Sequence, residues 1–311
     1  MIPRLDRGIF FLYTLCMPSK FTSIAASAGL LLAATIWGFS FVIVKDSLDY
    51  IGPYYMIAYR YTIAALAMSL LFIKKLRQLS WSYVKHGALT GLFLFLAYVT
   101  QTVGCDYTTA GKNAFLTTFY VIMIPLLTWL LFKKRPRFYV FIAAAMSLTG
   151  IGLLALGSGD KGFNIGDLLT LICGIFFALH IIYTEKYNRE GGDPLFLTTL
   201  QFIFTAICGW ISAPFFDGAF PMATAFTSRV VLSMLYLGLL STMVGFSLQN
   251  IGLKYVQSSI ASLFLSFESV FGILFSTLIL HEVFTLKMLI GCTLIFLAVI
   301  LAENGWRLFK K

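Results

Sequence analysis

Residues 101–110 read QTVGCDYTTA, and residues 249–258 read QNIGLKYVQS. Along the two stretches, identical or similarly small residues recur at a constant offset: Gln101 with Gln249, Gly104 with Gly252, Tyr107 with Tyr255, Ala110 with Ser258, and Ala114 with Ser262. Further landmarks follow at slightly different offsets, with Pro53 and Arg60 mirrored by Pro194 and Gln201, and Trp37 by Phe176. Such self-similarity predicts an internal duplication of the chain.

The composition indicates that the duplicated chain lies in a membrane. Of the 311 residues, 59% are hydrophobic and only 12% are charged, and the mean hydropathy is +0.88. Soluble domains are about 45–50% apolar and about 25% charged, so this chain has too little polar surface to cover a fold in water. The same values exclude a disordered chain, a coiled coil, a small disulfide scaffold and a cytosolic multidomain enzyme.

Apolar runs of about 20 residues, long enough to cross a bilayer, occur along the whole sequence. They lie at 22–44, 53–73, 84–104, 110–132, 137–157, 165–185, 194–216, 229–250, 255–280 and 284–303. The short connections leave no room for a soluble domain. We therefore predict an all-α integral membrane protein with ten transmembrane helices. Its predicted parts are a lead-in at 1–21, a first five-helix repeat at 22–157, a second at 165–303 and a basic tail at 304–311.

Basic residues gather in short clusters between alternate apolar runs, as at 74–85 and 133–137. With the N-terminus in the cytoplasm, the inward segments hold most of the 23 Lys and Arg. The outward segments hold only Lys45, Lys112, Lys161, Arg229 and Lys287. This positive-inside bias predicts that both termini are cytoplasmic and that the number of crossings is even. It also accounts for the net charge of +10 without a nucleic-acid partner.

The first residues also have features of a signal peptide, because Arg4 and Arg7 precede an apolar run at 8–17 and an Ala-Ser-Ala site at 26–28. Cleavage there would remove part of the first predicted helix. We therefore expect a cytoplasmic lead-in, or a translation start at Met17. The cysteines are Cys16, Cys105, Cys173, Cys208 and Cys292. They are odd in number, far apart and without a C-x-x-C pattern, so neither a disulfide framework nor a metal site is expected.

Five helices per repeat is an odd number, so the second repeat enters the membrane from the opposite side. Inverted repeats of this kind are typical of secondary transporters, in which the two halves exchange conformations around a site at the midplane. The alternating access of that site to the two sides follows from this symmetry. The alternative is an old duplication that persists without a moving part.

The pattern resembles the drug/metabolite transporter superfamily, in its two-repeat, ten-helix EamA-type branch. The resemblance covers nearly the whole chain and rests on WGFSF at 37–41, on the Pro53 to Arg60 spacing, and on LSFESV at 265–270 followed by Glu282. It implies a secondary transporter, often an exporter of amino acids or related metabolites. The short loops and the absence of an N-x-[ST] acceptor fit a bacterial inner membrane.

The sequence departs from the family pattern in the second half. The family usually has a proline where Ser269 stands, whereas the first half keeps its proline as Pro125. The second repeat therefore has no proline at this position that would predict a helix break.

Two ionisable residues inside predicted spans are the strongest candidates for substrate contact. Glu268 falls near the centre of its span, where an ionisable side chain costs at least about 2.5–3.5 kcal/mol. Because burial disfavours the charged carboxylate, Glu268 is our candidate for proton coupling, or for pairing with a substrate amine. Arg60 must face protein or a water-filled cavity and is a candidate for binding a substrate carboxylate. The alternatives are a structural carboxyl at Glu268 and a structural counter-ion at Arg60.

Other candidates recur at helical spacing along the fourth and ninth predicted helices. A cavity between these two helices would be largely aromatic, with a few polar anchors. The predicted substrate-binding residues are Trp37, Arg60, Gln101, Asn113, Thr117, Tyr120, His180, Gln249, Phe264 and Glu268. Core packing, and hydrogen bonds between helices, are the alternatives. A lone histidine such as His180 is more often part of the packing, and Lys112 is expected to extend to the outer interface.

Other functional classes fit less well. Residues 157–160 read GSGD, as in some intramembrane proteases. However, Asp160 falls in a predicted outside loop, and no second aspartate completes the pair. Because motifs for metal, phosphate or nucleotide sites are also missing, we predict no enzyme, no catalytic residue, no metal and no cofactor. A channel, an uncoupled facilitator of a hydrophobic or aromatic metabolite or drug, and a nontransporting membrane receptor stay as alternatives.

We expect an exporter of small metabolites, foremost amino acids or related amines, that works by alternating access in the bacterial inner membrane. Proton coupling through Glu268 is a hypothesis that rests on the position of this residue in its span. The expected partners are the small-molecule substrate, membrane lipid and protons.

Overall fold

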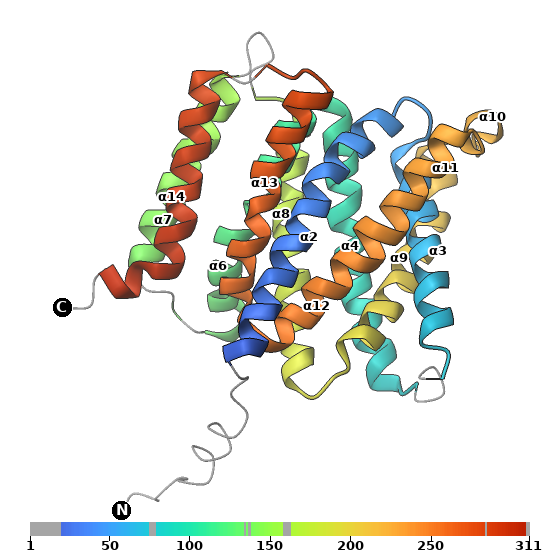
Figure 1. The fold of residues 1–311 in the computed structure, drawn as a ribbon, viewed down its shortest axis with the longest axis horizontal. Helices are drawn as coiled ribbons and strands as arrows, with labels where there is room; N and C mark the ends of the chain where they lie inside the picture. Colours follow the sequence, from blue (N-terminus) through green and yellow to red (C-terminus); the bar gives the residue numbers. More distant parts are fainter. Residues whose placement is uncertain are drawn as a thin grey trace, which may run out of the picture.

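The computed structural model describes residues 20–74, 79–133, 135, 138–157, 163–283 and 285–308 (Figure 1). Every regular element in these ranges is a helix, which confirms the predicted all-α class. Most of the predicted lead-in, parts of the basic clusters, Asp160 of the GSGD string and the end of the predicted tail lie outside the described residues.

The helices follow the predicted apolar runs. The first half contains α2 (Lys20–Ser47), α3 (Pro53–Leu71), α4 (Trp81–Tyr107), α5 (Ala110–Thr117), α6 (Tyr120–Phe132) and α7 (Phe138–Gly157). The second half contains α8 (Ile165–Arg189), α9 (Pro194–Phe216), α10 (Met222–Ala225), α11 (Ser228–Leu235), the π-helix η3 (Tyr236–Val244), α12 (Gly245–Tyr255), α13 (Ser258–Ile279) and α14 (Leu286–Leu308). Local signals set several starts: prolines stand at the first position of α3 and α9, where no N–H is needed, and Asn164 caps α8.

The predicted run at 110–132 is divided between α5 and α6. The break falls at Thr118, whose hydroxyl donates to the Phe115 carbonyl oxygen at 2.6 Å. Pro125 follows within α6 and cannot donate an intrahelical hydrogen bond. In the second half α13 is unbroken, and the hydroxyl of Ser269 donates back to the Ser266 carbonyl oxygen at 2.7 Å.

The predicted run at 229–250 contains the π-helix η3 and continues as α12 to Tyr255. The helix predicted to begin at 255 therefore begins at Ser258. Between them, Val256 has extended backbone angles that end α12. No compositional signal in this run distinguishes the π-helix from an ordinary helix.

Seven helical stretches of the described chain are long and apolar enough to cross a membrane. They are Ile24–Ser47, Trp81–Tyr107, Ala110–Phe132, Ile165–Arg189, Pro194–Phe216, Ser228–Tyr255 and Ile260–Ile279. The protein is thus a multi-pass membrane protein. The helices α3, α7 and α14 are not among the seven, and the ten crossings, the inverted orientation of the repeats and the cytoplasmic termini stay predictions.

The packing partners correspond when the two halves are exchanged. Helix α4 packs on α8 as α12 packs on α2, and α6 packs on α8 as α13 packs on α2. Helix α3 contacts η3 as α9 contacts α4, while α3 pairs with α9 and α7 with α14. The α7–α14 pair lies at one edge of the molecule (Figure 1). The main hydrophobic cluster draws on both halves and surrounds the centre of the remaining bundle.

Glycines allow α2 to pack closely on α13. A Cβ added at Gly38 would lie 2.4 Å from the Phe271 Cβ and 2.9 Å from the Gly272 backbone nitrogen. A Cβ added at Gly272 would lie 2.4 Å from the Ala114 Cβ on α5. Gly29, also on α2, has more room, because its added Cβ would meet only a leucine methyl group at 3.4 Å.

We predict that Gly38→Ala lowers the melting temperature in detergent, whereas Gly29→Ala leaves it unchanged or raises it. Overpacking at Gly38 should cost about 1–3 kcal/mol. At Gly29 the gain in helix propensity, up to about 1 kcal/mol, is not opposed by a clash. Thermal unfolding followed by circular dichroism measures both variants. Equal melting temperatures would contradict the close approach of α2 and α13.

Candidate functional site

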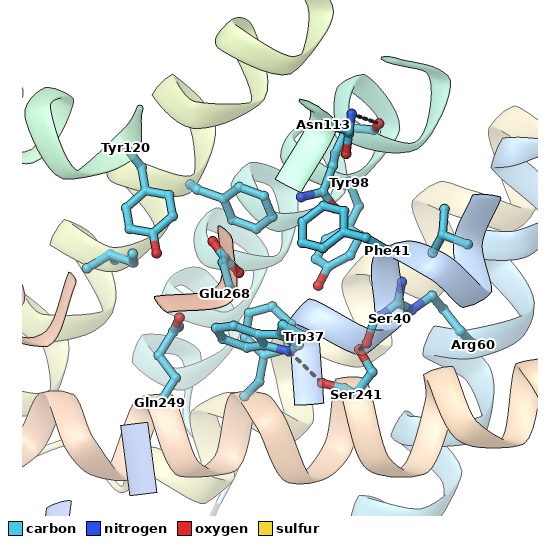
Figure 2. A pocket seen from close by; sticks show the side chains of 15 residues that line it. Trp37, Ser40, Phe41, Arg60, Tyr98, Asn113, Tyr120, Ser241, Gln249 and Glu268 are labelled. Carbon is cyan, nitrogen blue, oxygen red and sulfur yellow. Dashed lines mark hydrogen bonds between the residues drawn. The ribbon is translucent and has the colours of Figure 1, made fainter. Parts of the chain in front are cut away.

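A cavity with a volume of about 40 Å³ lies at the centre of the bundle (Figure 2). Both halves contribute to its wall. The lining residues are Trp37, Ser40, Phe41, Val44, Arg60, Tyr98, Gln101, Asn113, Tyr120, Phe177, Ile181, Ser241, Phe246, Gln249 and Glu268. This volume holds a few water molecules, so the cavity must widen before it can hold a metabolite.

Aromatic rings form much of the cavity wall. Trp37 and Phe246 have ring centroids 5.0 Å apart, and Tyr98 lies 5.4 Å from Phe177 in an edge-to-face arrangement. The centroids of Tyr98 and Phe246 are 6.0 Å apart, which joins the two pairs. Rings in such tilted and edge-to-face contacts can present apolar surface to a bound solute.

Arg60 enters the wall from α3 and is only 1% exposed. Its Nε donates to the Thr242 Oγ1 at 3.0 Å and its Nη2 to the Ser241 Oγ at 3.1 Å. The guanidinium carbon lies 4.6 Å from the centroid of the Tyr98 ring, a cation–π distance. No carboxylate in the described ranges forms an ion pair with Arg60. The arginine is therefore held in place while its charge is not neutralised.

Glu268 reaches the same cavity from the middle of α13 and is 5% exposed. Figure 2 shows the Tyr120 hydroxyl and the Gln249 side chain directed toward its carboxyl group. It too has no ion-pair partner among the residues that the structure describes. In this view Tyr98 lies between Glu268 and Arg60, and Trp37 lies below Glu268. The cavity thus places a buried acid and a buried base on different parts of its wall.

Amide side chains complete the polar part of the wall. The Asn113 Nδ2 donates to the Thr170 Oγ1 at 2.8 Å and to the Gln101 carbonyl oxygen at 3.1 Å. The Gln101 Nε2 donates to the Thr117 Oγ1 at 3.1 Å. These bonds connect α4, α5 and α8 and fix the two amides at the cavity.

Seven of the predicted substrate-binding residues line the cavity: Trp37, Arg60, Gln101, Asn113, Tyr120, Gln249 and Glu268. Three do not line it. Thr117 lies behind Gln101, which donates to it. His180 is fully buried with its Nε2 3.0 Å from the Gln201 Oε1, and Phe264 packs against the main hydrophobic cluster. Phe264 thus packs in the core, whereas Thr117 and His180 take part in hydrogen bonds between helices.

Several lining residues were not predicted from the sequence. They are Ser40, Phe41, Val44, Tyr98, Phe177, Ile181, Ser241 and Phe246. Tyr98 and Phe246 could have been predicted, because Tyr98 lies one helical turn before Gln101 and Phe246 one turn before Gln249, on the same helix face. Extending the repeat by one turn would have paired them.

The expectation that Lys112 extends to the interface is wrong. Its Nζ lies 2.6 Å from the Asp167 Oδ2, and the two side chains are 2% and 0% exposed. The Thr108 hydroxyl donates to the Asp167 Oδ1 at 2.9 Å, and the Asn164 backbone N–H donates to the Oδ2 at 3.0 Å. A carboxylate with this many partners at the start of α8 holds the lysine inside the bundle, one residue from Asn113.

The start of α5 is also bound to the segment that follows α13. The Glu282 carboxylate accepts from the backbone N–H groups of Ala110 and Gly111 at 2.7 and 2.9 Å. A carboxylate at a helix N-terminus satisfies donors that the helix itself leaves unpaired. The predicted outer end of the bundle is thus joined across the two halves on two sides of α5.

No group of three His, Cys, Asp or Glu in the described ranges is placed to hold a metal ion. The buried polar groups of the cavity are an arginine, a glutamate, amides and hydroxyls. This set can bind charged and hydrogen-bonding parts of a small solute, while the rings bind its apolar part.

Comparison with known proteins gives a family match over both halves. The sequence profile of the EamA-like transporter family matches residues 24–156 and residues 164–303. An uncharacterized transporter of Archaeoglobus fulgidus is 38% identical over 284 residues, which cover 89% of this chain and 85% of that protein. The uncharacterized transporter YvbV of Bacillus subtilis is 25% identical over 278 residues, or 86% of this chain and 88% of that protein.

A solved structure that bears only the name "Crystal structure of protein" has the same fold. The TM-score is 0.70 at 17% sequence identity, and the match covers 92% of this chain and 98% of that chain. At this identity the likeness concerns the fold alone.

We predict that Asp167→Asn destabilises the protein in detergent by about 3–5 kcal/mol, because it removes the carboxylate charge opposite a buried lysine. The double variant Lys112→Met/Asp167→Asn, which also removes the cation, should regain part of this loss. Thermal unfolding of both variants and the wild type provides the measurement. If Asp167→Asn has the same melting temperature as the wild type, the ion pair does not hold α5 to α8.

Proposed function

Because the chain belongs to the EamA-like transporter family and is a multi-pass membrane transporter, we propose that it exports small metabolites, foremost amino acids or related amines, by alternating access. The observation that carries the amino-acid assignment is the presence of a buried arginine and a buried glutamate in one cavity. Arg60 and Glu268 both line it, and neither has an ion-pair partner among the described residues.

An uncompensated charge in a protein interior is costly, and an opposite charge with good geometry offsets that cost. A zwitterionic amino acid supplies both counter-charges in one molecule. Its carboxylate fits the forked guanidinium of Arg60, and its ammonium fits the carboxylate of Glu268. A simple amine would satisfy only Glu268. The two kinds of ionisable group in the cavity therefore favour an amino acid over an amine that lacks the carboxylate.

The walls support an apolar or aromatic side chain on that solute. Trp37, Tyr98, Phe177 and Phe246 present ring surface in the wall of the same cavity. Aromatic and aliphatic groups gain free energy by leaving water for such a surface. Because these walls are apolar, uncoupled facilitation of a hydrophobic or aromatic metabolite is the second candidate function.

Alternating access is supported by the correspondence of packing partners between the halves and by the family profile matching each half. At the predicted outer end, the Lys112–Asp167 ion pair joins α5 to α8, and Glu282 joins the start of α5 to the segment that follows α13. At the opposite end a second hollow of about 540 Å³ lies among the ends of α6 and α8 and the start of α13. With the orientation predicted from the basic loops, this hollow faces the cytoplasm, which is where an exporter loads its solute.

Glu268 is the proposed site of proton coupling. If it takes up a proton, its charge is lost and a bound ammonium group is no longer held. Release of the proton restores the carboxylate and its affinity for the next ammonium. Proton movement and solute movement would then be linked at the carboxyl group of Glu268. The other ionisable side chains that line the cavity are Arg60, Tyr98 and Tyr120.

We predict that proteoliposomes of the wild type show saturable uptake of amino acids and that an imposed pH gradient accelerates it. Glu268→Gln keeps the shape of the side chain but cannot titrate, so its transport should be slow and independent of the gradient. Uptake of a mixed amino-acid and metabolite pool, with and without the gradient, measures both properties.

Two other outcomes have defined meanings. Transport by Glu268→Gln at the wild-type rate, with the same response to the gradient, would exclude coupling through Glu268. Uptake that ignores the gradient in both proteins would favour the uncoupled facilitator. Empty liposomes and liposomes with Gly29→Ala, a substitution away from the cavity, serve as controls.

A further inference from the structure

Within the described ranges, the hydrogen bonds that Arg60 donates end on hydroxyl groups of one unusual element. Ser241 and Thr242 lie in η3, a π-helix between α11 and α12. Such segments are rare and frequently occur at functional sites. Both residues are fully buried, and Ser241 lines the cavity beside Arg60.

Ser241 is a junction between three side chains. Its Oγ accepts from the Arg60 Nη2 at 3.1 Å and shares a hydrogen bond of 2.8 Å with the Ser40 Oγ. Its carbonyl oxygen accepts from the Trp37 Nε1 at 2.8 Å, as the dashed line in Figure 2 shows. Thr242 completes the set by accepting from the Arg60 Nε at 3.0 Å. The π-helix therefore fixes the positions of both Arg60 and Trp37.

The chemical identity of the acceptors matters more than their number. A guanidinium has five N–H donors in a planar fork. The hydroxyls of Ser241 and Thr242 take the side of the fork formed by Nε and Nη2, which leaves the Nη1 and Nη2 end for another bidentate acceptor. A hydroxyl orients the fork without neutralising its charge, whereas an Asp or Glu at the same place would neutralise it.

We propose that Ser241 and Thr242 are positioning residues that orient Arg60 and keep its charge available, so that they determine the preference of the carrier for solutes with a carboxylate group. The proposal rests on the proposed function, in which Arg60 binds the carboxylate of the solute. It goes beyond that function by locating the determinant of specificity in the π-helix, on residues that need not touch the solute.

The test compares Ser241→Asp with Ser241→Asn in otherwise unchanged full-length protein. The two substitutions have nearly the same size, but only aspartate brings a charge that can pair with Arg60. The probes are phenylalanine and leucine, together with phenethylamine and isoamylamine, which are the same molecules without the carboxylate. Calorimetric titration of the purified proteins in detergent gives the Kd of each probe, and size-exclusion chromatography confirms that each variant is monodisperse.

In Ser241→Asp we expect the Kd of the amino acids to rise about tenfold or more, while the Kd of the amines stays the same or falls. Ser241→Asn should keep the wild-type ratio of the two affinities within about threefold. Equal weakening of amino acids and amines, or the same shift in both variants, would overturn the proposal. Wild-type protein that binds none of the four probes would overturn the proposed amino-acid function as well, so the two failures are distinguishable.

Thr242 gives a second test that does not introduce a buried charge. Thr242→Val removes only the acceptor for the Arg60 Nε, and Thr242→Ser retains it. In proteoliposomes Thr242→Val should raise the KM for the amino acid that wild type carries by about tenfold, with little change in the maximal rate. Thr242→Ser should have the same KM as the wild type. A fall in the maximal rate at unchanged KM would indicate a structural role and overturn the proposal.

Discussion

Arg60 and Glu268 lie at the centre of a bundle built to exclude water, and they do not neutralise each other. Removing a charged group from water costs several kcal/mol unless partners compensate it. Much of the central architecture can be understood as a response to that cost. Hydroxyls of η3 and the ring of Tyr98 support the arginine, and rings and amides form much of the remaining cavity wall. Because neither residue has an ion-pair partner among the described residues, the proposed solute would stabilise the cavity further. Its carboxylate would pair with Arg60 and its ammonium group with Glu268.

The arrangement of the helices follows from the need to place these two residues in one cavity. Arg60 belongs to α3 and Glu268 to α13, so the cavity can form only where the two halves meet. The close approach of α2 to α13 at Gly38 brings Trp37 and Ser40 beside the residues of α13. On the far side, Asn113 and Gln101 close the wall through hydrogen bonds that include Thr170 of α8. Each half therefore supplies parts of the site that the other lacks.

Sequence reasoning located the helices and the two charged residues because both leave strong local signals. Long apolar runs mark the spans, and an Arg or Glu inside such a run is conspicuous. The aromatic wall was only partly identified, since a chain with 31 Phe and 15 Tyr offers many rings at helical spacing. The burial of Lys112 could not be predicted, because its partner Asp167 is distant in the sequence and lies near the start of another helix. Ser241 and Thr242 gave no signal, because hydroxyl residues are common in spans and the π-helix has no composition of its own.

The ion pair between Lys112 and Asp167 has a further consequence for the energy of the proposed cycle. By the offsets of the internal repeat, the position that matches Lys112 is Ile260, and the positions that match Asp167 fall in the small-residue stretch at 26–28. If the halves exchange conformations, opening the predicted outer end separates the buried Lys112–Asp167 ion pair. Among the described residues, the ion pairs at the other end lie within the C-terminal end of α8 and its cap and need not separate. The two states therefore differ in free energy although corresponding helices form them. In the proposed cycle, a bound solute would have to contribute the free energy that offsets this difference.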